Sequence, residues 1–328
     1  MPPQASASIL SLPEMGCGTW AWGNRLLWDY EESMDDDLQQ VFEHCVRHGV
    51  TLFDSGDSYG TGKLSGQSEK LLGKFSAAYT GPNREKICLA TKLAPYPWRL
   101  TQQSMFNAGE ASAQRLGQLD LVQMHWSTAN YLPWQEGPLL DGLAALCQQG
   151  VAKGMGVSNF GPKRLRLAHQ RLQEKGLKIQ TLQVQYSLLS TYPVTQLGLK
   201  EVCDELGIQL IAYSPLGLGL LTGKYKSKSD LPKGLRKFAL SQILPGVKPL
   251  LACLSAIATE KEKNMAQVAI NWCICKGTIP IPGAKNLQQA KQNTGALGWR
   301  LTDAEVTELD QASAACTKQM VQNIFQSR

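Results

Sequence analysis

The stretch Phe53-Asp54-Ser55-Gly56-Asp57-Ser58-Tyr59-Gly60 runs from the end of an apolar segment into a polar loop that contains glycine. The apolar segment is typical of a short buried strand. The same arrangement returns in Leu89-Ala90-Thr91-Lys92 and in Leu121-Val122-Gln123-Met124-His125-Trp126, where a polar residue stands at or just past the end of an apolar run. Because the active sites of parallel barrels lie at the carboxyl ends of their strands, this repetition favours a barrel with one polar end.

Strand-like and helix-like segments alternate along the rest of the chain. The predicted strands end near Gly18, Asp54, Lys92, Met124, Gly156, Gln185, Ala212 and Ile281. The predicted helices cover residues 35–48, 66–77, 102–116, 139–149, 161–174, 197–206, 264–276 and 287–295. In the first helix, apolar residues recur at three- and four-residue steps, and Gly49 is expected to end it. Apolar strands that are each followed by a helix predict a parallel sheet.

Eight such units predict an α/β fold, a (β/α)8 TIM barrel in which residues 1–328 form a single domain. The alternative is an open, doubly wound sheet, which needs a glycine-rich turn after an early strand. Gly16-Cys17-Gly18 matches that turn poorly, because it lacks a third glycine at the right offset. The barrel is therefore the prediction.

Three further segments are expected around the barrel. The connection from Tyr213 to about Lys263 is much longer than the others, and we expect a loop that lies over a cofactor, with a plain surface loop as the alternative. Its basic residues are Lys224, Lys226, Lys228, Lys233, Arg236 and Lys237. A last helix is predicted at 302–313, with Thr302 and Glu305 forming a capping box. The tail Met320–Arg328 is predicted to fold back over the barrel mouth.

Composition excludes several classes of protein. Hydrophobic residues make up 43% of the chain, which is enough for a sizeable core. The net charge of +6 is spread without a dense basic tract, so nucleic-acid binding is not expected. No apolar run reaches membrane-spanning length, and no membrane association is expected. The nine cysteines predict free thiols in a reducing compartment, and the four histidines do not cluster, so no metal site is predicted.

Asp54, Tyr59, Lys92 and His125 together suit one reaction. A phenol is a weak acid, with a reference pKa of roughly 10, and a nearby cation eases the release of its proton. Lys92 can supply that cation, Asp54 can hold Lys92 charged, and His125 can orient a carbonyl oxygen by a hydrogen bond. Each residue alone has an ordinary structural interpretation. All four at strand ends predict that Tyr59 gives a proton to a carbonyl oxygen while hydride arrives from a cofactor.

Other residues near these strand ends are expected to shape the site without taking part in the reaction. Asp57 is a second carboxylate near Tyr59 that could compete with Asp54 for the catalytic role. We expect it to fix the loop rather than to take part in the reaction. Trp20, Trp22 and Trp126 are predicted to form the wall of a substrate pocket, with packing in the core or at the rim as the alternative.

The second half of the chain carries groups that suit a dinucleotide. Ser158 and Asn159 follow the fifth strand, and with Gln183 they can bind an amide such as a nicotinamide carboxamide, although Ser158 or Asn159 can also cap a helix. Tyr213 can stack on a flat heterocycle. The stretch Ile279-Pro280-Ile281-Pro282-Gly283-Ala284-Lys285 leads into a helix, and a glycine turn at a helix N-terminus with an added lysine suits a phosphate.

From end to end the chain resembles the aldo-keto reductases, in which the order of Asp54, Tyr59, Lys92 and His125 is the catalytic tetrad pattern. The resemblance implies NADPH as the cofactor. The residues implied to bind it are Ser158, Asn159, Gln183, Tyr213, Ser214, Pro215, Leu216, Gly283, Lys285, Gln289, Gln292 and Asn293. The segment around Lys285 is implied to hold the adenosine 2′-phosphate, which favours NADPH over NADH. Basic members of the family carry Arg where this chain has Gln289, which predicts a less sharp preference.

Within that family the resemblance is nearest to the pyridoxal reductases of plant plastids. It is carried by Gly18-Thr19-Trp20-Ala21-Trp22-Gly23-Asn24, Ser33-Met34-Asp35-Asp36, His125-Trp126-Ser127-Thr128-Ala129, residues 269–277 and Gln322-Asn323-Ile324-Phe325-Gln326. The chain departs from the pattern of these proteins at two places. Its N-terminal segment is short and shows no transit region, and Cys17 stands where an aromatic residue is usual. We expect Cys17 to touch the floor of the barrel or pocket and to shift substrate choice.

The resemblance implies reduction of an aldehyde, foremost pyridoxal to pyridoxine. Two alternatives stay open at this point: a general reductase of reactive aldehydes, and a nucleotide-sensing barrel subunit like those that bind potassium channels. The expected partner is a small-molecule aldehyde, and the protein is expected to be a monomer. The resemblance implies a chloroplast location, whereas residues 1–12 do not look like a transit peptide and leave a trimmed start or a cytoplasmic protein open.

Overall fold

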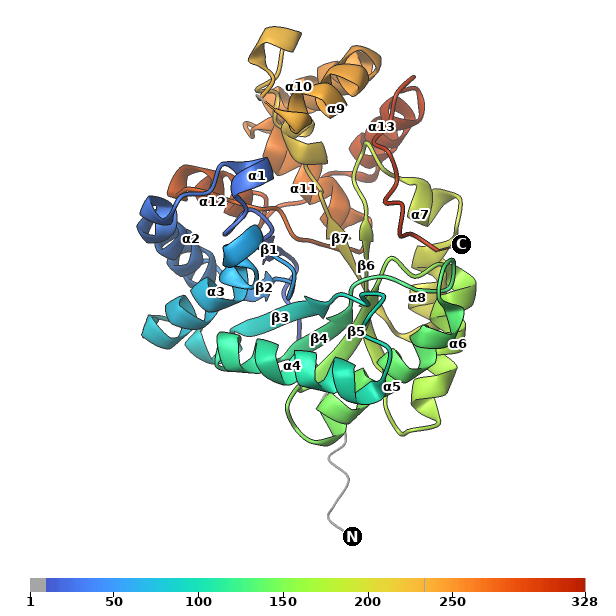
Figure 1. Ribbon diagram of the computed structural model, residues 1–328. Coiled ribbons are helices and arrows are strands. Elements are labelled where there is room, and N and C mark those ends of the chain that lie inside the picture. The colour runs from blue at the N-terminus through green and yellow to red at the C-terminus, as the bar shows by residue number, and fades with distance from the viewer. Residues whose placement is uncertain (1–9, 233, 328) are drawn as a thin grey trace.

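The predicted (β/α)8 barrel is confirmed by the computed structural model, which describes residues 10–232 and 234–327. Eight parallel strands pair in chain order, and helices surround them (Figure 1). The strands are β1 (Gly16–Gly18), β2 (Leu52–Asp54), β3 (Cys88–Leu93), β4 (Leu121–Met124), β5 (Gly154–Ser158), β6 (Ile179–Gln185), β7 (Gln209–Tyr213) and β8 (Ile279–Pro280). A parallel bridge between Gly18 and Gly283 joins the last strand to the first.

The helices follow the predicted order, with additional short ones between them. The α-helices are α1 (Arg25–Trp28), α2 (Asp35–Arg47), α3 (Gln67–Ala78), α4 (Gln102–Leu116), α5 (Pro133–Gln148), α6 (Pro162–Gln173), α7 (Tyr192–Thr195), α8 (Leu199–Leu206), α9 (Leu235–Ile243), α10 (Lys248–Glu260), α11 (Met265–Cys275), α12 (Leu287–Thr294) and α13 (Asp303–Ala314). The short 3-10 helices are η1 (Glu32–Met34), η2 (Gly62–Leu64), η3 (Arg84–Lys86), η4 (Gly217–Thr222), η5 (Lys228–Asp230) and η6 (Leu244–Val247). The predicted capping box of Thr302 and Glu305 is present at the start of α13.

Two predicted boundaries are wrong. Helix α5 begins at Pro133 rather than at residue 139, because its first turns carry Trp134 and polar residues without the apolar spacing that marks its later part. The long connection after Tyr213 is not only a loop, since it contains α9 and α10. Leu250, Leu254 and Ile257 recur at helical spacing in α10 and are buried, and the prolines and glycine just before them obscured that pattern.

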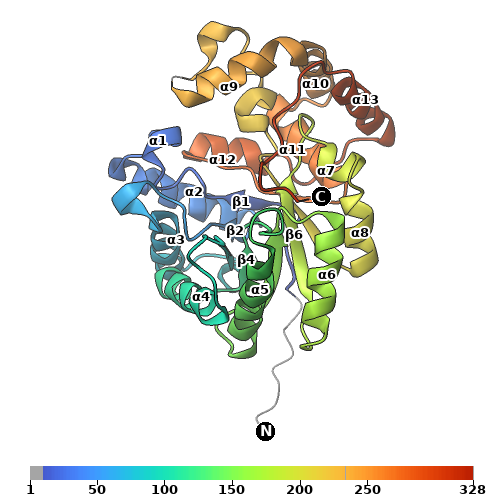
Figure 2. The same ribbon diagram turned by 45° about the vertical axis from the view of Figure 1, so that its right-hand side comes forward.

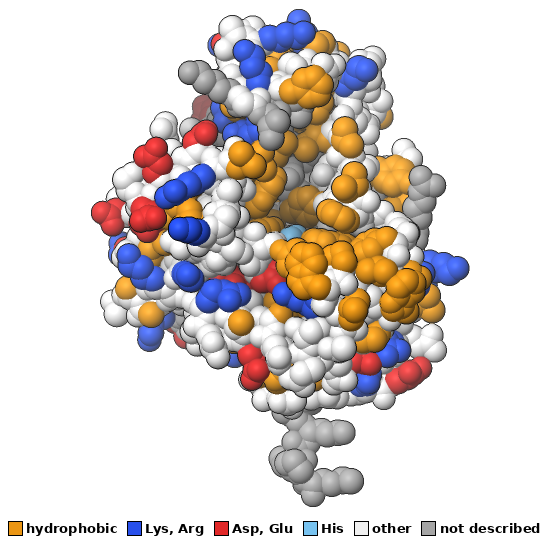
Figure 3. Space-filling model, in the orientation of Figure 1, with side chains coloured by type: hydrophobic (Ala, Val, Ile, Leu, Met, Phe, Trp, Pro, Cys, Tyr) orange, Lys and Arg blue, Asp and Glu red, His pale blue; other side chains and the backbone are white. Residues whose placement is uncertain are grey.

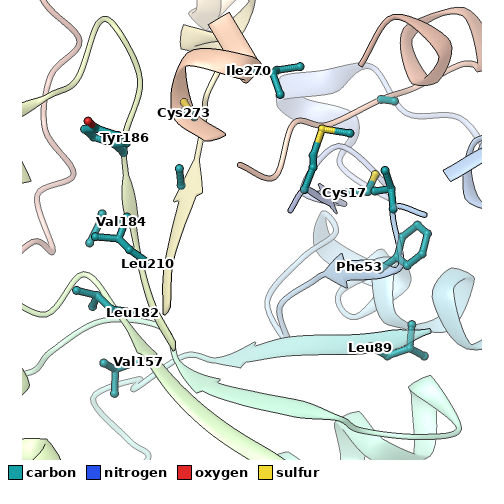
Figure 4. Close-up of a cluster of buried hydrophobic side chains, with 14 of the residues drawn as sticks. Cys17, Phe53, Leu89, Val157, Leu182, Val184, Tyr186, Leu210, Ile270 and Cys273 are labelled. Atoms are coloured by element: carbon teal, nitrogen blue, oxygen red, sulfur yellow. The ribbon is translucent and has the colours of Figure 1, made fainter. Parts of the chain in front are cut away.

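Side chains alternate between the inside of the barrel and the layer under the helices. The outward-facing apolar residues of the strands pack against the helices, and Figure 4 shows Phe53, Leu89, Val157, Leu182 and Leu210 among them. Inside the barrel, a smaller apolar cluster that includes Leu52, Ala90, Leu121, Ile211 and Ile281 fills the region below the polar strand ends. The barrel is therefore a filled scaffold, and its open end is at the carboxyl ends of the strands.

The expectation that Cys17 touches the barrel or pocket floor is wrong. The two neighbouring glycines face the barrel interior, so the side chain between them points outward (Figure 4). Cys17 is 2% exposed and its thiol lies next to that of Cys45 in α2. Cys17 therefore packs under a helix and does not reach a bound substrate. All nine cysteines are unpaired, as predicted.

The C-terminal tail folds back over the barrel mouth as predicted, although Arg328 lies outside the described residues, as do residues 1–9 and Lys233. Both ribbon views place the end of the chain beside β6 and α6 at the open end (Figures 1 and 2). The backbone N–H of Met320 donates to the carbonyl of Leu189 at 2.9 Å, and that of Ser327 donates to the carbonyl of Asn159 at 3.0 Å. The tail is thus tied down at both ends.

One helical stretch passes the length and composition test for a membrane span, contrary to the sequence-based expectation. It covers Arg236–Glu260, which is α9, η6 and α10 in succession. A single such helix is weak support for a membrane span, because core helices of soluble proteins pass the same test. Here Leu250, Leu254 and Ile257 pack into the protein core.

Candidate active site

A cavity of about 810 Å³ opens at the carboxyl ends of the strands. Figure 3 shows a hollow on this face with hydrophobic side chains around it. The predicted site residues that line the cavity are Asp54, Tyr59, Lys92, His125, Ser158, Asn159, Gln183, Tyr213, Ser214, Pro215, Leu216, Gly283, Lys285, Gln289, Gln292, Asn293, Trp20 and Trp126. Segments more than two hundred residues apart in the sequence therefore meet in one place, as the barrel requires.

Asp54 lies at the centre of the tetrad. One carboxylate oxygen pairs with the ammonium of Lys92, and both side chains are almost fully buried. The other oxygen accepts hydrogen bonds from Gln123 at 3.0 Å and from Gln183 at 2.9 Å. The Lys92 ammonium lies 5.0 Å from the centre of the Tyr59 ring. The carboxylate thus holds the lysine beneath the phenol, as the sequence predicted.

The charges around Tyr59 leave it protonated at neutral pH. Burial raises the pKa of Tyr59, and the Lys92 ammonium opposes that shift. Burial alone would lower the pKa of Lys92, but attraction by Asp54 and Tyr59 outweighs it, and the net shift is upward. Lys92 therefore stays charged, and it favours the phenolate that remains when Tyr59 has given up its proton.

His125 is neutral at physiological pH. Burial, with a contribution from the Lys92 charge, holds the pKa of His125 well below its usual range. Its ring centre lies 5.9 Å from that of Tyr59, with the planes at 66°. A neutral imidazole carries one N–H, which can donate to a carbonyl oxygen without competing as a proton source. These protonation states make Tyr59 the candidate acid of the pair.

Asp57 fixes the loop that carries Tyr59, as predicted. Its carboxylate accepts from the backbone N–H of Ala94 at 3.1 Å and from Arg99 at 2.8 Å. The backbone N–H of Asp57 donates to the carbonyl of Lys92 at 2.9 Å. These bonds attach the loop to the end of β3, so that Tyr59 is held above the buried lysine.

Gln123 is a site residue that the sequence analysis missed. It lies in the same register row of the barrel as Lys92, Gly156 and Thr181. A side chain at Gly156 would come within 2.0 Å of the Thr181 hydroxyl and 3.2 Å of Gln123, so this row has room for the glutamine only because residue 156 is glycine. The signal in the sequence was a lone amide inside the apolar run of β4.

Replacement of this amide by an apolar group of similar size, Gln123→Leu, is expected to lower kcat. The Asp54 oxygen that Gln123 contacts then keeps only the bond from Gln183, so the Asp54–Lys92 pair is less well fixed beneath Tyr59. The loss of one buried hydrogen bond predicts a decrease of roughly two- to tenfold. Steady-state kinetics measure it, with a thermal melt to check folding. A folded variant with the wild-type kcat and pH profile would contradict this role.

The predicted nicotinamide-binding residues form one hydrogen-bonded group. The Ser158 hydroxyl donates to the carbonyl of Gln183 at 2.9 Å, and the Asn159 amide donates to Ser158 at 3.0 Å. Helix α6 starts from Gly161 without a side-chain cap, so the alternative that Ser158 or Asn159 caps it is excluded. Asn159 has a positive φ of 58°, which is a strained backbone conformation. Its hydrogen bond to Ser158 helps to hold that conformation at the edge of the cavity.

The far end of the cavity is cationic. The Lys285 ammonium donates to the carbonyl of Trp28 at 3.1 Å, and the Arg236 guanidinium stacks 4.1 Å from the centre of the Trp28 ring. Burial lowers the pKa of Lys285, and the charges of Arg236 and Lys224 lower it further. The indole N–H of Trp28 and the Nε of Arg236 are buried donors without a partner among the described residues. Crowded cations and unpartnered donors suit an anionic, acceptor-rich group.

Two of the three predicted wall tryptophans line the cavity. Trp126 stacks on Phe325 of the tail with ring centres 4.3 Å apart, and Trp20 meets Trp28 edge-on at 5.7 Å. The assignment of Trp22 to the wall is wrong, because it is 0% exposed and its indole N–H donates to the carbonyl of Ala284 at 3.0 Å. The turn after β1 directs Trp22 into the core, which was the alternative.

Residues 14–314 match the model of the aldo/keto reductase family. The chain belongs to this family. A chloroplastic pyridoxal reductase of Arabidopsis thaliana is 54% identical over 97% of the chain and 88% of the relative. The NADP(+) aldo-keto reductase yakc of Schizosaccharomyces pombe is 30% identical over 86% of the chain and 84% of the relative.

Solved structures of aldo-keto reductases share the fold. One is a thermostable aldo-keto reductase in complex with the inhibitor epalrestat, with a TM-score of 0.72 and 25% identity. The match covers 92% of this chain and 95% of that one. Among the residues that the structure describes here, no group of three or more His, Cys, Asp or Glu side chains is placed to hold a metal ion.

Proposed function

We propose that this aldo/keto reductase uses NADPH to reduce pyridoxal to pyridoxine, as a single catalytic domain. The 54% identity with the Arabidopsis pyridoxal reductase carries the proposal. The tetrad around Asp54 and the aromatic wall of Trp20 and Trp126 support it. Purified protein mixed with NADPH and pyridoxal is therefore expected to consume NADPH and to form pyridoxine. A protein that binds NADPH without reducing pyridoxal or any other aldehyde would refute the proposal and favour a nucleotide-sensing role.

The cavity carries groups suited to both ends of NADPH. Ser158, Asn159 and Gln183 would hold the carboxamide, and Tyr213 would stack on the nicotinamide ring. Lys285 and its neighbours Arg236 and Trp28 lie at the other end, where buried donors have no partner among the residues that the structure describes and cations crowd. A phosphate there would satisfy those donors and relieve the repulsion between the cations.

The positions of the tetrad residues support the following mechanism. When bound, NADPH supplies a hydride from its nicotinamide ring. The neutral His125 donates a hydrogen bond to the aldehyde oxygen, and Tyr59 transfers its proton to that oxygen as negative charge develops there. Lys92 stabilises the phenolate that remains, and Asp54 keeps Lys92 charged and in place. Solvent then returns a proton to Tyr59.

The 2′-phosphate contact can be tested without touching the chemistry. Lys285→Ala is expected to weaken NADPH binding about ten- to a hundredfold and NADH binding far less, because only NADPH carries the 2′-phosphate. A charge-assisted hydrogen bond of roughly 1.5–3 kcal/mol corresponds to that factor. Fluorescence titration measures both dissociation constants.

Lys226→Ala is the matched control for this experiment, since Lys226 is an exposed lysine of the basic connection after Tyr213 and does not line the cavity. It removes the same charge and should leave both dissociation constants near the wild-type values. Equal weakening of NADPH and NADH by Lys285→Ala would mean that Lys285 only supports the fold.

The proposal also covers the location of the protein in the cell and its oligomeric state. The Arabidopsis relative is named as chloroplastic, and we place this protein in the plastid on that basis. We further propose that it acts as a monomer, because the described residues build the whole cavity from one chain. A fluorescent fusion of the native gene product tests the first statement, and the mass in solution tests the second.

A further inference from the structure

Asn323, in the C-terminal tail, is joined to the nicotinamide side of the cavity through Tyr213. Its side-chain amide donates to the Tyr213 hydroxyl at 2.8 Å. The Tyr213 hydroxyl in turn donates to the side-chain oxygen of Asn159 at 3.0 Å. Because a phenol has one proton, the bond received from Asn323 leaves that proton for Asn159. The direction of the three-residue relay is thereby fixed.

Both ends of the relay are held in a defined orientation. The side-chain oxygen of Asn323 accepts the backbone N–H of Phe325 at 2.9 Å, which leaves its NH2 group for Tyr213. The NH2 group of Asn159 donates to the carbonyl of His125 at 3.1 Å and to Ser158 at 3.0 Å. Asn159 keeps its side-chain oxygen toward Tyr213 despite the positive φ of its backbone.

Burial supports the same direction of donation. It raises the pKa of Tyr213, and the hydrogen bond from Asn323 opposes that shift. The phenol is therefore protonated across the physiological range and remains a donor to Asn159.

The same tail segment also positions the substrate wall. Phe325, two residues after Asn323, stacks on Trp126 with its ring plane 17° from parallel. Ser327 closes the segment, since its hydroxyl accepts the backbone N–H of Gly161 at 2.8 Å and its backbone N–H donates to Asn159. Docking of the tail therefore fixes groups on the cofactor side and on the substrate side in one step.

We propose that Asn323 is a positioning residue for the nicotinamide ring, and that it acts by holding Tyr213 and Asn159 in the relay. The inference rests on the proposed use of NADPH and extends it to the tail. Without Asn323, the Tyr213 hydroxyl loses the hydrogen bond that it accepts from the tail. The stacking surface and the amide of Asn159 then become less well ordered, which weakens the binding of the nicotinamide end of NADPH.

A double-mutant cycle between Asn323→Ala and Tyr213→Phe tests the relay. Each single change is expected to raise the dissociation constant of NADPH roughly three- to tenfold, the range for one or two neutral hydrogen bonds. In the Tyr213→Phe background, Asn323→Ala should change it less than about 1.5-fold, because no hydroxyl remains to accept the bond. The control Ile324→Ala alters an adjacent side chain that is 82% exposed and should leave binding unchanged.

A second measurement separates the positioning of the cofactor by Asn323 from a general loosening of the tail. Phe325→Leu weakens the contact with Trp126 and should raise KM for the aldehyde while the dissociation constant of NADPH stays within about twofold of wild type. Asn323→Ala should raise the dissociation constant of NADPH, which Phe325→Leu does not. If Asn323→Ala has its full effect in the Tyr213→Phe background, or no effect alone, the relay is wrong. If wild-type protein does not bind NADPH, the proposed function itself fails.

Discussion

Tyr59→Phe is expected to abolish carbonyl reduction while NADPH binding stays close to that of the wild type. The substitution removes the hydroxyl and keeps the ring, which is the group that packs beside His125 and above Lys92. In the proposed mechanism Tyr59 is the proton donor, because the neutral His125 is a hydrogen-bond donor and Lys92 is held charged by Asp54. General acid catalysis predicts a decrease in turnover of roughly a hundredfold or more.

Single-turnover kinetics with bound NADPH measure this loss at the chemical step. Fluorescence titration with NADPH is the control, since the hydroxyl is not assigned to the cofactor and the dissociation constant should move less than about twofold. Turnover within a few-fold of the wild-type value would remove Tyr59 from the mechanism.

Lys92→Met is expected to suppress turnover by a different route. The cation that stabilises the Tyr59 phenolate is lost, and Asp54 is left as a buried charge. Because Lys92 opposes the upward shift of the Tyr59 pKa, its removal raises that pKa further. The alkaline fall in the pH–rate profile should therefore move to higher pH while the plateau drops. Breaking such a buried pair also costs about 3–5 kcal/mol of folding stability.

The double variant Asp54→Asn with Lys92→Met separates the two effects. It removes both charges and should recover much of the lost melting temperature without recovering turnover. Lys92→Met protein that is folded and keeps the wild-type pH–rate profile would contradict the assigned role, as would a double variant that regains activity.

The sequence predicted the barrel and the tetrad because both depend on short-range patterns. Apolar runs of strand length that end in Asp54, Lys92 and His125 specify where each strand stops and which end of the barrel is polar. In a parallel barrel that information is enough to bring the three side chains together. The capping box at Thr302 was equally local, and it is present.

Two of the errors, at Trp22 and Cys17, concern the direction of a side chain, which depends on tertiary contacts. Trp20 and Trp22 are two residues apart in one turn, yet one lines the cavity and the other bonds to Ala284, which is 262 positions away in the chain. Cys17 points under a helix because its neighbours face the barrel. Helices α9 and α10 were hidden by the proline-containing break between them.

The residues that were missed are those whose partners lie far away in the sequence. Gln123 stands inside an apolar run and acts on Asp54, 69 positions earlier. Asn323 lies in a tail that has no periodic pattern and meets Tyr213, 110 positions earlier. No local spacing reports such contacts, because they arise only when the barrel closes and the tail folds onto it.

The most direct test is the specificity constant for pyridoxal, measured by NADPH oxidation against a panel of aliphatic aldehydes of similar size. Trp20 and Trp126 line the cavity together with the tetrad, and aromatic walls favour a flat ring. Pyridoxal is predicted to have the highest kcat/KM of the panel, above its 5′-phosphate ester, with pyridoxine as the product. Aliphatic aldehydes that outcompete pyridoxal by a wide margin would contradict the account and identify a general aldehyde reductase.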